Sequence, residues 1–301
     1  MRDVIVGGGG WASRAAQAVL LKKFNQDVQR ISVYGSTSRR EQLEDGNIIE
    51  IKEWIGTEEE SNTRYFLPFA FLTVDKFDLY GEEKYKSTNR VLIKNALDFI
   101  SRNKPKYCVL FSSGITHSRF SILDRPRAYM VYRELKLEEE KALKMQCNET
   151  GTKLVICRLF NASGRLIPSL HKYALSNLIY QGIVHGRIQV KSSFPVVRKY
   201  IDMEQLLEIC LLAVEGEQEL EFDSTGSLVQ LHDLAAMCAK ELSVEYSRQL
   251  IQTAQSDNYF SNSTDTETLA KRYNIPLYPI ERQIQETING VKKLIDRGLL
   301  H

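Results

Sequence analysis

Short apolar runs and amphipathic patterns alternate along the first 160 residues. The apolar runs predict strands at residues 3–6, 30–34, 47–53, 65–74, 107–112 and 153–159. Between them, apolar positions three and four residues apart predict helices over residues 12–24, 86–101 and 129–148. Such alternation is typical of an α/β fold, a doubly wound parallel sheet with helices on both faces. Ligands bind sheets of this kind at the carboxyl ends of the strands.

The pattern changes after Asn161-Ala162-Ser163-Gly164. A predicted helix over residues 166–181 is followed by an extended stretch, a second helix over 203–214 and mixed segments, and no linker separates them. We therefore predict a cofactor-binding domain over residues 1–164, completed by about 196–226. A smaller interleaved substrate-binding region is predicted over residues 165–195 and 227–301.

Composition limits the classes of function. The chain has 301 residues, 43% hydrophobic and 26% charged, with a net charge of +2, which is typical of a soluble enzyme and gives no support for nucleic-acid binding. No apolar run approaches the ~20 residues that span a bilayer, so no membrane partner is expected. The first apolar run begins at Val4, which leaves no room for a secretory leader and favours a cytoplasmic protein.

Reactive and charged residues outside the motifs have simple interpretations. The five cysteines lack metal or disulfide spacing and are expected to be buried free thiols, and the scattered histidines do not suggest a structural zinc site. Two acidic runs, residues 58–60 and 138–140, are expected to lie on an exposed loop and an exposed helix face.

A glycine-rich turn follows the first predicted strand, with the sequence Val6-Gly7-Gly8-Gly9-Gly10-Trp11-Ala12-Ser13. Gly7, Gly10 and Ser13 have the spacing of a dinucleotide-binding turn, in which the backbone approaches a pyrophosphate and the first N–H groups of the helix point at it. We expect Gly7, Gly10, Trp11, Ala12 and Ser13 to bind the cofactor. Ser13 occupies a position that is usually glycine, and a flexible turn without a ligand is the alternative.

The second predicted strand leads into Tyr34-Gly35-Ser36-Thr37-Ser38-Arg39-Arg40. No acidic side chain is present here to bind the ribose hydroxyls of NAD, whereas hydroxyl and guanidinium groups suit a 2'-phosphate. The sequence therefore favours NADP, bound by Ser36, Ser38 and Arg39, with NAD as the alternative. A loop whose arginines face water is also compatible with these residues.

Tyr132 precedes Lys136 by four residues in a predicted helix, after a strand that ends in Ser112-Ser113. Side chains four residues apart share one helix face, and an adjacent ammonium lowers the pKa of a phenol, so this pair can transfer a proton while a hydride moves. Tyr80 and Lys84 have the same spacing. They lie in a predicted loop before the strand that ends in Ser112-Ser113, so Tyr132 is favoured as the proton-transfer residue.

Together these segments resemble the extended short-chain dehydrogenase/reductase family, in its nucleotide-sugar epimerase, dehydratase and ketoreductase branch. The resemblance covers nearly the whole chain and includes the tyrosine helix, Arg158-Leu159-Phe160-Asn161-Ala162-Ser163-Gly164, and the segment from Val197 to Leu206. It implies a Rossmann-type fold, a nucleotide-sugar substrate and a possible homodimer.

The resemblance also implies roles for individual residues. Tyr132 is the catalytic acid or base, Lys136 binds the nicotinamide ribose and tunes the phenol, and Ser113 binds the reacting oxygen. Asn89 matches an asparagine of the family's preceding helix, which we group with the catalytic residues. Asn161 and Arg198 match residues that contact the diphosphate and the nucleotide, and their alternatives are a strand cap and a surface ion pair.

Departures from the family pattern argue against two of the family's activities. Gly114-Ile115 stands where 4,6-dehydratases carry an acidic pair, and Gly114 and Arg165 stand where epimerase-reductases carry cysteine and histidine. Two activities remain. One is a ketoreductase, in which NADPH gives a hydride and Tyr132 protonates the keto oxygen of a nucleotide-linked sugar. The other is an NAD-dependent 4-epimerase. We predict the ketoreductase because the cofactor segment favours NADP. A non-catalytic cofactor-sensing or scaffold protein is the alternative from another class.

Overall fold

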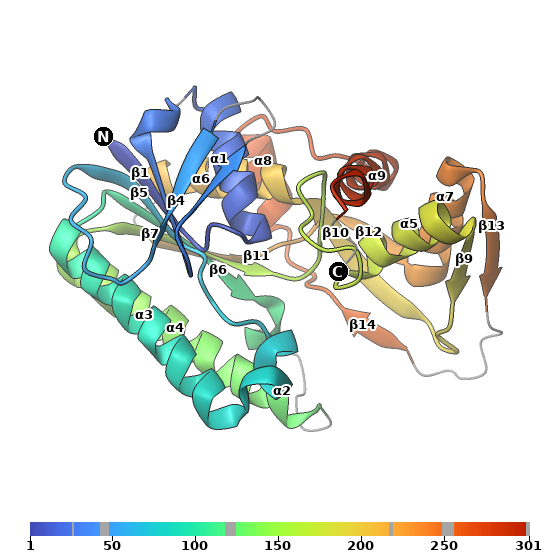
Figure 1. Cartoon of the computed structure of the whole chain (residues 1–301), viewed down its shortest axis with the longest axis horizontal. Coiled ribbons are helices and arrows are strands. Elements are labelled where there is room, and N and C mark those ends of the chain that lie inside the picture. Colours follow the sequence, from blue (N-terminus) through green and yellow to red (C-terminus); the bar gives the residue numbers. More distant parts are fainter. Residues whose placement is uncertain (26, 43–47, 118–124, 217–218, 249–255, 299–301) are drawn as a thin grey trace. The chain divides into compact units, whose positions relative to one another are not determined.

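The computed structural model describes residues 1–25, 27–42, 48–117, 125–216, 219–248 and 256–298. Two compact units make up the chain (Figure 1). The first comprises Met1–Leu159 and Cys210–Phe222, and the second comprises Phe160–Ile209 and Asp223–His301.

The first unit is built on an eight-stranded sheet in the order β11-β7-β6-β5-β1-β2-β4-β3. Neighbours from β7 to β4 run parallel, and β3 pairs antiparallel with β4 at the edge. The strands are β1 (Arg2–Val6), β2 (Ile31–Gly35), β3 (Arg39–Gln42), β4 (Ile48–Glu53), β5 (Thr63–Pro68), β6 (Tyr107–Ser113), β7 (Lys153–Leu159) and β11 (Glu219–Asp223). The chain crosses from one side of β1 to the other between β4 and β5, so the order reverses at β1 and β5, where open α/β sheets bind ligands.

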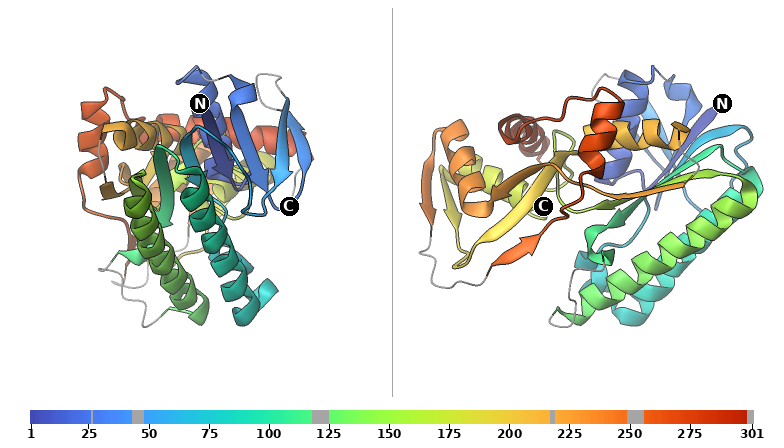
Figure 2. Two further views of the ribbon diagram at one scale, coloured as in Figure 1. Left: turned by 90° about the vertical axis from the view of Figure 1, so that its left-hand side faces the viewer. Right: turned by 180° about the vertical axis from the view of Figure 1, so that it is seen from behind.

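Helices cover both faces of this sheet, as predicted. Figures 1 and 2 show α3 (Glu82–Asn103) and α4 (Arg127–Thr150) side by side on one face and α1 (Trp11–Lys22) on the other. Val4 and Val6 of β1 face α3, where the Phe66 and Phe99 rings stack with centroids 4.4 Å apart. Shorter helices follow α1, β5 and β6, namely η1 (Val28–Arg30), η2 (Val74–Lys76), α2 (Phe77–Tyr80) and η3 (Gly114–Thr116).

Two predicted strands differ from those in the structure. The segment predicted over 47–53 is β4, which begins at Ile48, and residue 47 lies outside the described residues. It pairs antiparallel with β3 to form the β3–β4 hairpin, so the described residues between β2 and β4 contain a strand and no helix. The strand predicted over 65–74 ends at Pro68, because proline lacks the N–H group that a ladder needs and the chain then turns.

The second unit contains smaller sheets. Strand β10 (Val196–Asp202) pairs antiparallel with β12 (Ser227–Gln230) and parallel with β14 (Asp257–Tyr259) and β8 (Ala162–Ser163). A separate pair joins β9 (Arg187–Val190) to β13 (Glu245–Arg248). Its helices are α5 (Ala174–His185), α7 (Leu231–Leu242), α8 (Asp265–Arg272) and α9 (Ile280–Asp296), whereas α6 (Met203–Gly216) is divided between the units.

Two features of the second unit concern the segment after β8. The helix predicted over residues 166–181 begins only at Ala174, and the residues before it form turns and bends. Gly290 of α9 lies so close to Arg165 that a Cβ there would be 2.3 Å from the Arg165 carbonyl oxygen. The absence of a side chain therefore allows α9 to pack against this segment.

All five cysteines are buried and free, as predicted. Among the described residues, no helix combines the length and apolar character needed to cross a membrane.

Candidate functional site

The glycine turn connects β1 to α1 at the carboxyl edge of the sheet. Gly7 has φ +101°, and a Cβ on it would lie 2.9 Å from the carbonyl carbon of Phe69, so only glycine fits without strain. Gly10 is the N-cap of α1, and among the described residues no side chain caps this end and no acidic residue lies in its first turn. An anionic group can therefore approach the helix N-terminus of Trp11, Ala12 and Ser13.

Ser13 fits the position where a third glycine is usual. It is fully buried, and its hydroxyl accepts a hydrogen bond from the Gln17 amide at 3.3 Å. The small side chain therefore packs within α1 with a polar partner.

Arginine side chains lie beside this turn. The Arg39 guanidinium lies 2.9 Å from the place of a Cβ on Gly9, and both Arg39 (3.8 Å) and Arg14 (3.1 Å) pair with Glu41. Arg39 therefore belongs to an edge strand that brings it to the turn, rather than to an open loop. Two guanidinium groups share one carboxylate there, which leaves positive charge for an anion.

The predicted serines of this segment differ in their surroundings. Ser36 is exposed. The Ser38 hydroxyl accepts a hydrogen bond from the Glu53 backbone N–H at 3.1 Å and so holds the β3–β4 hairpin.

Tyr132 and Ser113 are brought together by α4 and β6. Ser113 ends β6, and Tyr132 lies in the second turn of α4, near enough for Ser113 to influence the ionisation of its phenol. Burial has the largest effect on Tyr132 and raises the pKa of its phenol. The charges of Glu139 and Asp75 raise this pKa further, whereas Ser113 lowers it.

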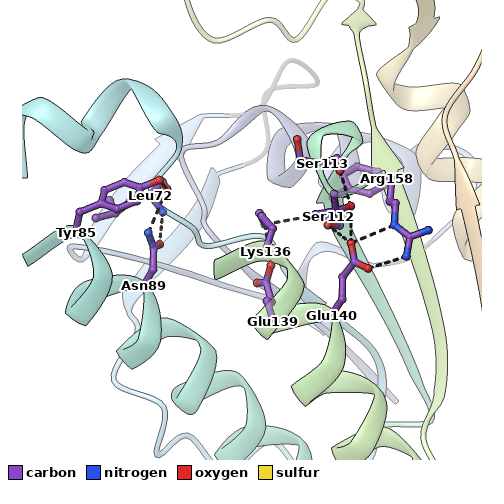
Figure 3. A network of polar contacts seen from close by, with 11 residues as sticks. Leu72, Tyr85, Asn89, Ser112, Ser113, Lys136, Glu139, Glu140 and Arg158 are labelled. Atoms are coloured by element: carbon purple, nitrogen blue, oxygen red, sulfur yellow. Dashed lines mark hydrogen bonds and ion pairs between the residues drawn. The ribbon is translucent and has the colours of Figure 1, made fainter. Parts of the chain in front are cut away.

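Lys136 lies one turn along α4 and is enclosed by three groups. Its ammonium donates to Glu139 Oε2 at 2.8 Å and to the Phe111 carbonyl at 3.2 Å, and lies 3.8 Å from the centre of the Phe71 ring. The same ring meets Tyr132 edge to face, with centroids 5.9 Å apart. Phe71 therefore connects the lysine and the tyrosine (Figure 3 shows Lys136 and Glu139).

Glu140 fastens α4 to the sheet (Figure 3). Its carboxylate accepts hydrogen bonds from Ser112 (2.5 Å), Thr116 (2.9 Å) and the Arg158 guanidinium (2.7 and 3.2 Å). Arg158 also pairs with Glu221 at 2.5 Å. This network fixes the direction of α4 and hence the place of Tyr132 at the end of β6.

Asn89 of α3 is fully buried and binds the segment after β5 rather than the tyrosine. Its amide accepts a hydrogen bond from the Leu72 N–H at 2.8 Å and donates to the Leu72 carbonyl at 3.3 Å, which also accepts from the Tyr85 hydroxyl at 2.7 Å (Figure 3). Asn89 thereby holds the chain next to Phe71.

Tyr80 and Lys84, which share the spacing of Tyr132 and Lys136, lie on different helices. Gly81, with φ +71°, ends α2 and precedes α3, and the Lys84 ammonium lies over the Tyr80 ring, 5.6 Å from its centre. A helix break between the two residues removes the shared face that the spacing implies.

Asn161 and Arg198 belong to the second unit and meet at β14. Asn161 donates to the carbonyls of Tyr259 (3.2 Å) and Lys199 (3.4 Å). Arg198 pairs with the Asp257 carboxylate and donates to the Asp257 carbonyl, both at 2.7 Å. In this structure the two side chains therefore join β10 to β14.

Solved structures with the same architecture are numerous. A UDP-N-acetylglucosamine 4-epimerase from Methanobrevibacter ruminantium, in complex with UDP-N-acetylmuramic acid, matches with a TM-score of 0.74 and 15% identity over 97% of this chain and 99% of that one. A UDP-glucose 4-epimerase from Thermotoga maritima with UDP-glucose matches with a TM-score of 0.72 and 16% identity, over 98% of this chain and 100% of that one. A double mutant of a dTDP-glucose 4,6-dehydratase from Streptomyces venezuelae, with NAD bound, matches with a TM-score of 0.72 and 13% identity, over 99% of this chain and 98% of that one.

The chain has the fold of the extended short-chain dehydrogenases/reductases. Comparisons with protein-family models and with curated protein sequences found no match. The resemblance that the motifs suggested is thus confirmed at the level of fold.

The expectation that both acidic runs are exposed was wrong for Glu60, Glu139 and Glu140. The acidic run at 138–140 was expected on an exposed face, but Glu139 and Glu140 are buried, and Glu60 of the other run is buried against the Tyr34 hydroxyl at 2.7 Å. Helical spacing was the available signal, because residues three and four positions after Lys136 return to its face.

Sequence reasoning also missed Phe71 and the β14 residues that contact Asn161 and Arg198. No local motif marks them, since they meet their partners through the fold.

Proposed function

We propose that this chain is a nicotinamide-dinucleotide oxidoreductase that reduces a keto group of a nucleotide-linked sugar, with Tyr132 as the proton donor. The observation that carries the proposal is the arrangement of Tyr132 and Lys136 around the Phe71 ring, with the Lys136 ammonium bound to the Phe111 carbonyl of β6, the strand that ends in Ser113. This strand ends at the carboxyl edge of a parallel sheet whose first turn is rich in glycine.

The residues of the first unit fit a dinucleotide. The side-chain-free backbone at Gly7 and the uncapped N-terminus of α1 suit a pyrophosphate. A reduced nicotinamide, when bound, supplies the hydride. Ser113 would orient the keto oxygen by a hydrogen bond, and Tyr132 would give that oxygen its proton.

NADP is the cofactor that this chain's own residues favour. Arg39 and Arg14 lie beside the turn with a single carboxylate between them, and β2 ends at Gly35 without an acidic residue to bind the ribose hydroxyls. NAD is bound in the dehydratase structure described above, and it is the alternative for this chain.

A nucleotide-linked sugar is the proposed substrate class because the structures of the same fold that were solved with UDP-glucose and UDP-N-acetylmuramic acid match nearly the full chain. Asn161 and Arg198 are the residues proposed to bind its diphosphate and nucleotide. Arg198 would then exchange Asp257 for a phosphate.

A 4-epimerase is the second candidate, and the two matching 4-epimerase structures favour it. An epimerase must first remove a proton from a hydroxyl, so Tyr132 would have to act as a phenolate. The buried Glu139 carboxylate, bound to Lys136 at 2.8 Å, disfavours a phenolate at Tyr132 and so favours reduction instead.

Cofactor binding and turnover test these proposals separately. Titration with NADPH and NADH, together with analysis of any dinucleotide released on denaturation, distinguishes an exchangeable NADPH from a retained NAD. Arg39→Ala is expected to weaken NADPH binding more than NADH binding, with the neighbouring Arg40→Ala as the control. Binding of neither cofactor would favour the non-catalytic scaffold.

Turnover is then measured with NADPH and a panel of keto nucleotide sugars. Tyr132→Phe is expected to abolish reduction because the ring loses its acidic proton, whereas Tyr80→Phe is expected to retain it. Unchanged turnover in Tyr132→Phe would refute the assignment of the proton donor.

A further inference from the structure

The buried ion pair between Lys136 and Glu139 lies on the same helix as the proposed proton donor, and Lys136 and Tyr132 contact the same Phe71 ring. Both side chains come from α4, and only 6% of the lysine and 4% of the glutamate are exposed. The ammonium has further contacts with the Phe111 carbonyl and the Phe71 ring, so it is held on the side of Glu139 (Figure 3).

A buried carboxylate next to this lysine changes what the lysine does to the phenol. A lone ammonium would favour the phenolate of Tyr132, whereas an ion pair presents opposite charges whose fields largely cancel at a neighbouring group. Burial raises the pKa of Glu139, while its contact with Lys136 lowers it and the charge of Glu140 raises it.

Among the residues that the structure describes, the other ionisable groups that act on Tyr132 add no positive charge. Asp75 from η2 raises the pKa of Tyr132, as Glu139 does. Tyr85 from α3 is a neutral neighbour, and the Cys108 thiol of β6 has its pKa raised in part by the charge of Glu139. Of the described groups that act on Tyr132, Ser113 lowers the pKa of the phenol.

We propose that Glu139 is a positioning residue whose carboxylate binds the Lys136 ammonium, cancels its charge toward Tyr132 and so biases the site toward proton donation. The proposal rests on the function proposed above and makes it directional. In reduction, the keto carbon accepts the hydride that the reduced dinucleotide loses, and the oxygen accepts the Tyr132 proton; the resulting phenolate regains a proton from water. Oxidation of an alcohol needs the phenolate at the start, which Glu139 disfavours.

The test measures the ionisation of Tyr132 by NMR, in protein labelled with carbon-13 at the tyrosine ζ position. The Tyr132 resonance is assigned by its absence from the Tyr132→Phe variant. In the unaltered protein, Tyr132 is expected to stay protonated through about pH 10. Glu139→Gln keeps the shape and an acceptor for Lys136 but removes the charge, so the phenolate fraction at pH 9 should rise by about tenfold or more. Glu138→Gln is the matched control, because Glu138 is exposed and pairs with Arg90.

Several outcomes would overturn the proposal. A Tyr132 midpoint near neutral pH in the unaltered protein would contradict it without any variant that must fold. A Glu139→Gln titration that coincides with that of the unaltered protein or of Glu138→Gln would also contradict it.

A double variant separates charge cancellation from a purely structural role. Lys136→Met/Glu139→Leu replaces the pair by apolar side chains, a change that buried ion pairs often tolerate. Because both charges leave together, Tyr132 should stay protonated through about pH 10, unlike in Glu139→Gln. If Tyr132 forms phenolate in the double variant to the same extent as in Glu139→Gln, the proposal is overturned.

These titrations use no sugar substrate, so they distinguish the two proposals. If keto sugars are not reduced but Glu139→Gln still shifts Tyr132, the function fails and the electrostatic role of Glu139 stands. If keto sugars are reduced but Glu139→Gln does not change the ionisation of Tyr132, the proposed function stands and the electrostatic role of Glu139 fails.

Discussion

Replacing Glu140 by leucine removes the acceptor that fastens α4 to the sheet. The Ser112 hydroxyl would lose its hydrogen bond to the carboxylate inside the protein, whereas Thr116 would keep a second bond, to the Ser113 carbonyl at 2.8 Å. Arg158 would lose two hydrogen bonds but keep Glu221 as a charge partner. A buried hydroxyl without a partner costs about 1–3 kcal/mol, and a charged hydrogen bond contributes a similar amount, so we expect a loss of about 3 kcal/mol.

Tryptophan fluorescence during urea unfolding measures this loss where it occurs. The chain has two tryptophans, Trp11 and Trp54, and both are buried in the first unit. With a slope of about 2 kcal/mol per molar urea, the midpoint should fall by roughly 1.5 M. The exposed Glu138→Gln is the control and should change stability by less than about 1 kcal/mol. A Glu140→Leu midpoint within about 0.3 M of the unaltered protein would refute the structural role given to this carboxylate.

Three further predictions concern backbone space and one buried carboxyl. Gly7→Ala should abolish dinucleotide binding in a fluorescence titration, because its φ of +101° and the nearby backbone exclude a side chain, whereas Gly9→Ala, which meets only the end of a flexible side chain, should still fold. Gly290→Ala should destabilise the second unit by about 1–3 kcal/mol in thermal unfolding, since its Cβ would overlap a carbonyl oxygen; the exposed Asn289→Ala should not. Burial raises the pKa of Asp202 to about 7, so the folded state binds this proton more tightly than the unfolded state. Stability should therefore fall by about 1.4 kcal/mol per pH unit from about pH 4 to 7, and Asp202→Asn should remove this fall in unfolding experiments across that range; an unchanged slope would contradict the assignment.

Local sequence patterns predicted the central sheet because its strands are short, apolar and bounded by polar turns. The predicted strand over residues 153–159 coincides with β7, and the helix predicted over 129–148 is α4 with two residues added at each end. The β3–β4 hairpin was not predicted, because β3 is an exposed edge strand with the polar sequence Arg39-Arg40-Glu41-Gln42 and buries no apolar face that a pattern could reveal.

The candidate site was predictable where its residues are close in sequence. Tyr132 and Lys136 share a helix face, and Gly7 to Ser13 form one turn, so spacing alone brought them into view. Asn89 illustrates the limit: its helix was predicted, but its hydrogen bonds to Leu72 depend on how α3 packs against the segment after β5. Contacts across 17 residues of chain carry no local signature.

The division of the chain between its two units has a consequence for synthesis on the ribosome. Strand β11 completes the edge of the first sheet beside β7, and Lys144 and Arg158 bind it through Glu221. It is translated only after residues 160–209 of the second unit. Until residue 223 leaves the ribosome, β7 remains an open edge that can pair with another chain. Chaperone binding to nascent chains should therefore persist until β11 emerges, and should decline once that edge is covered.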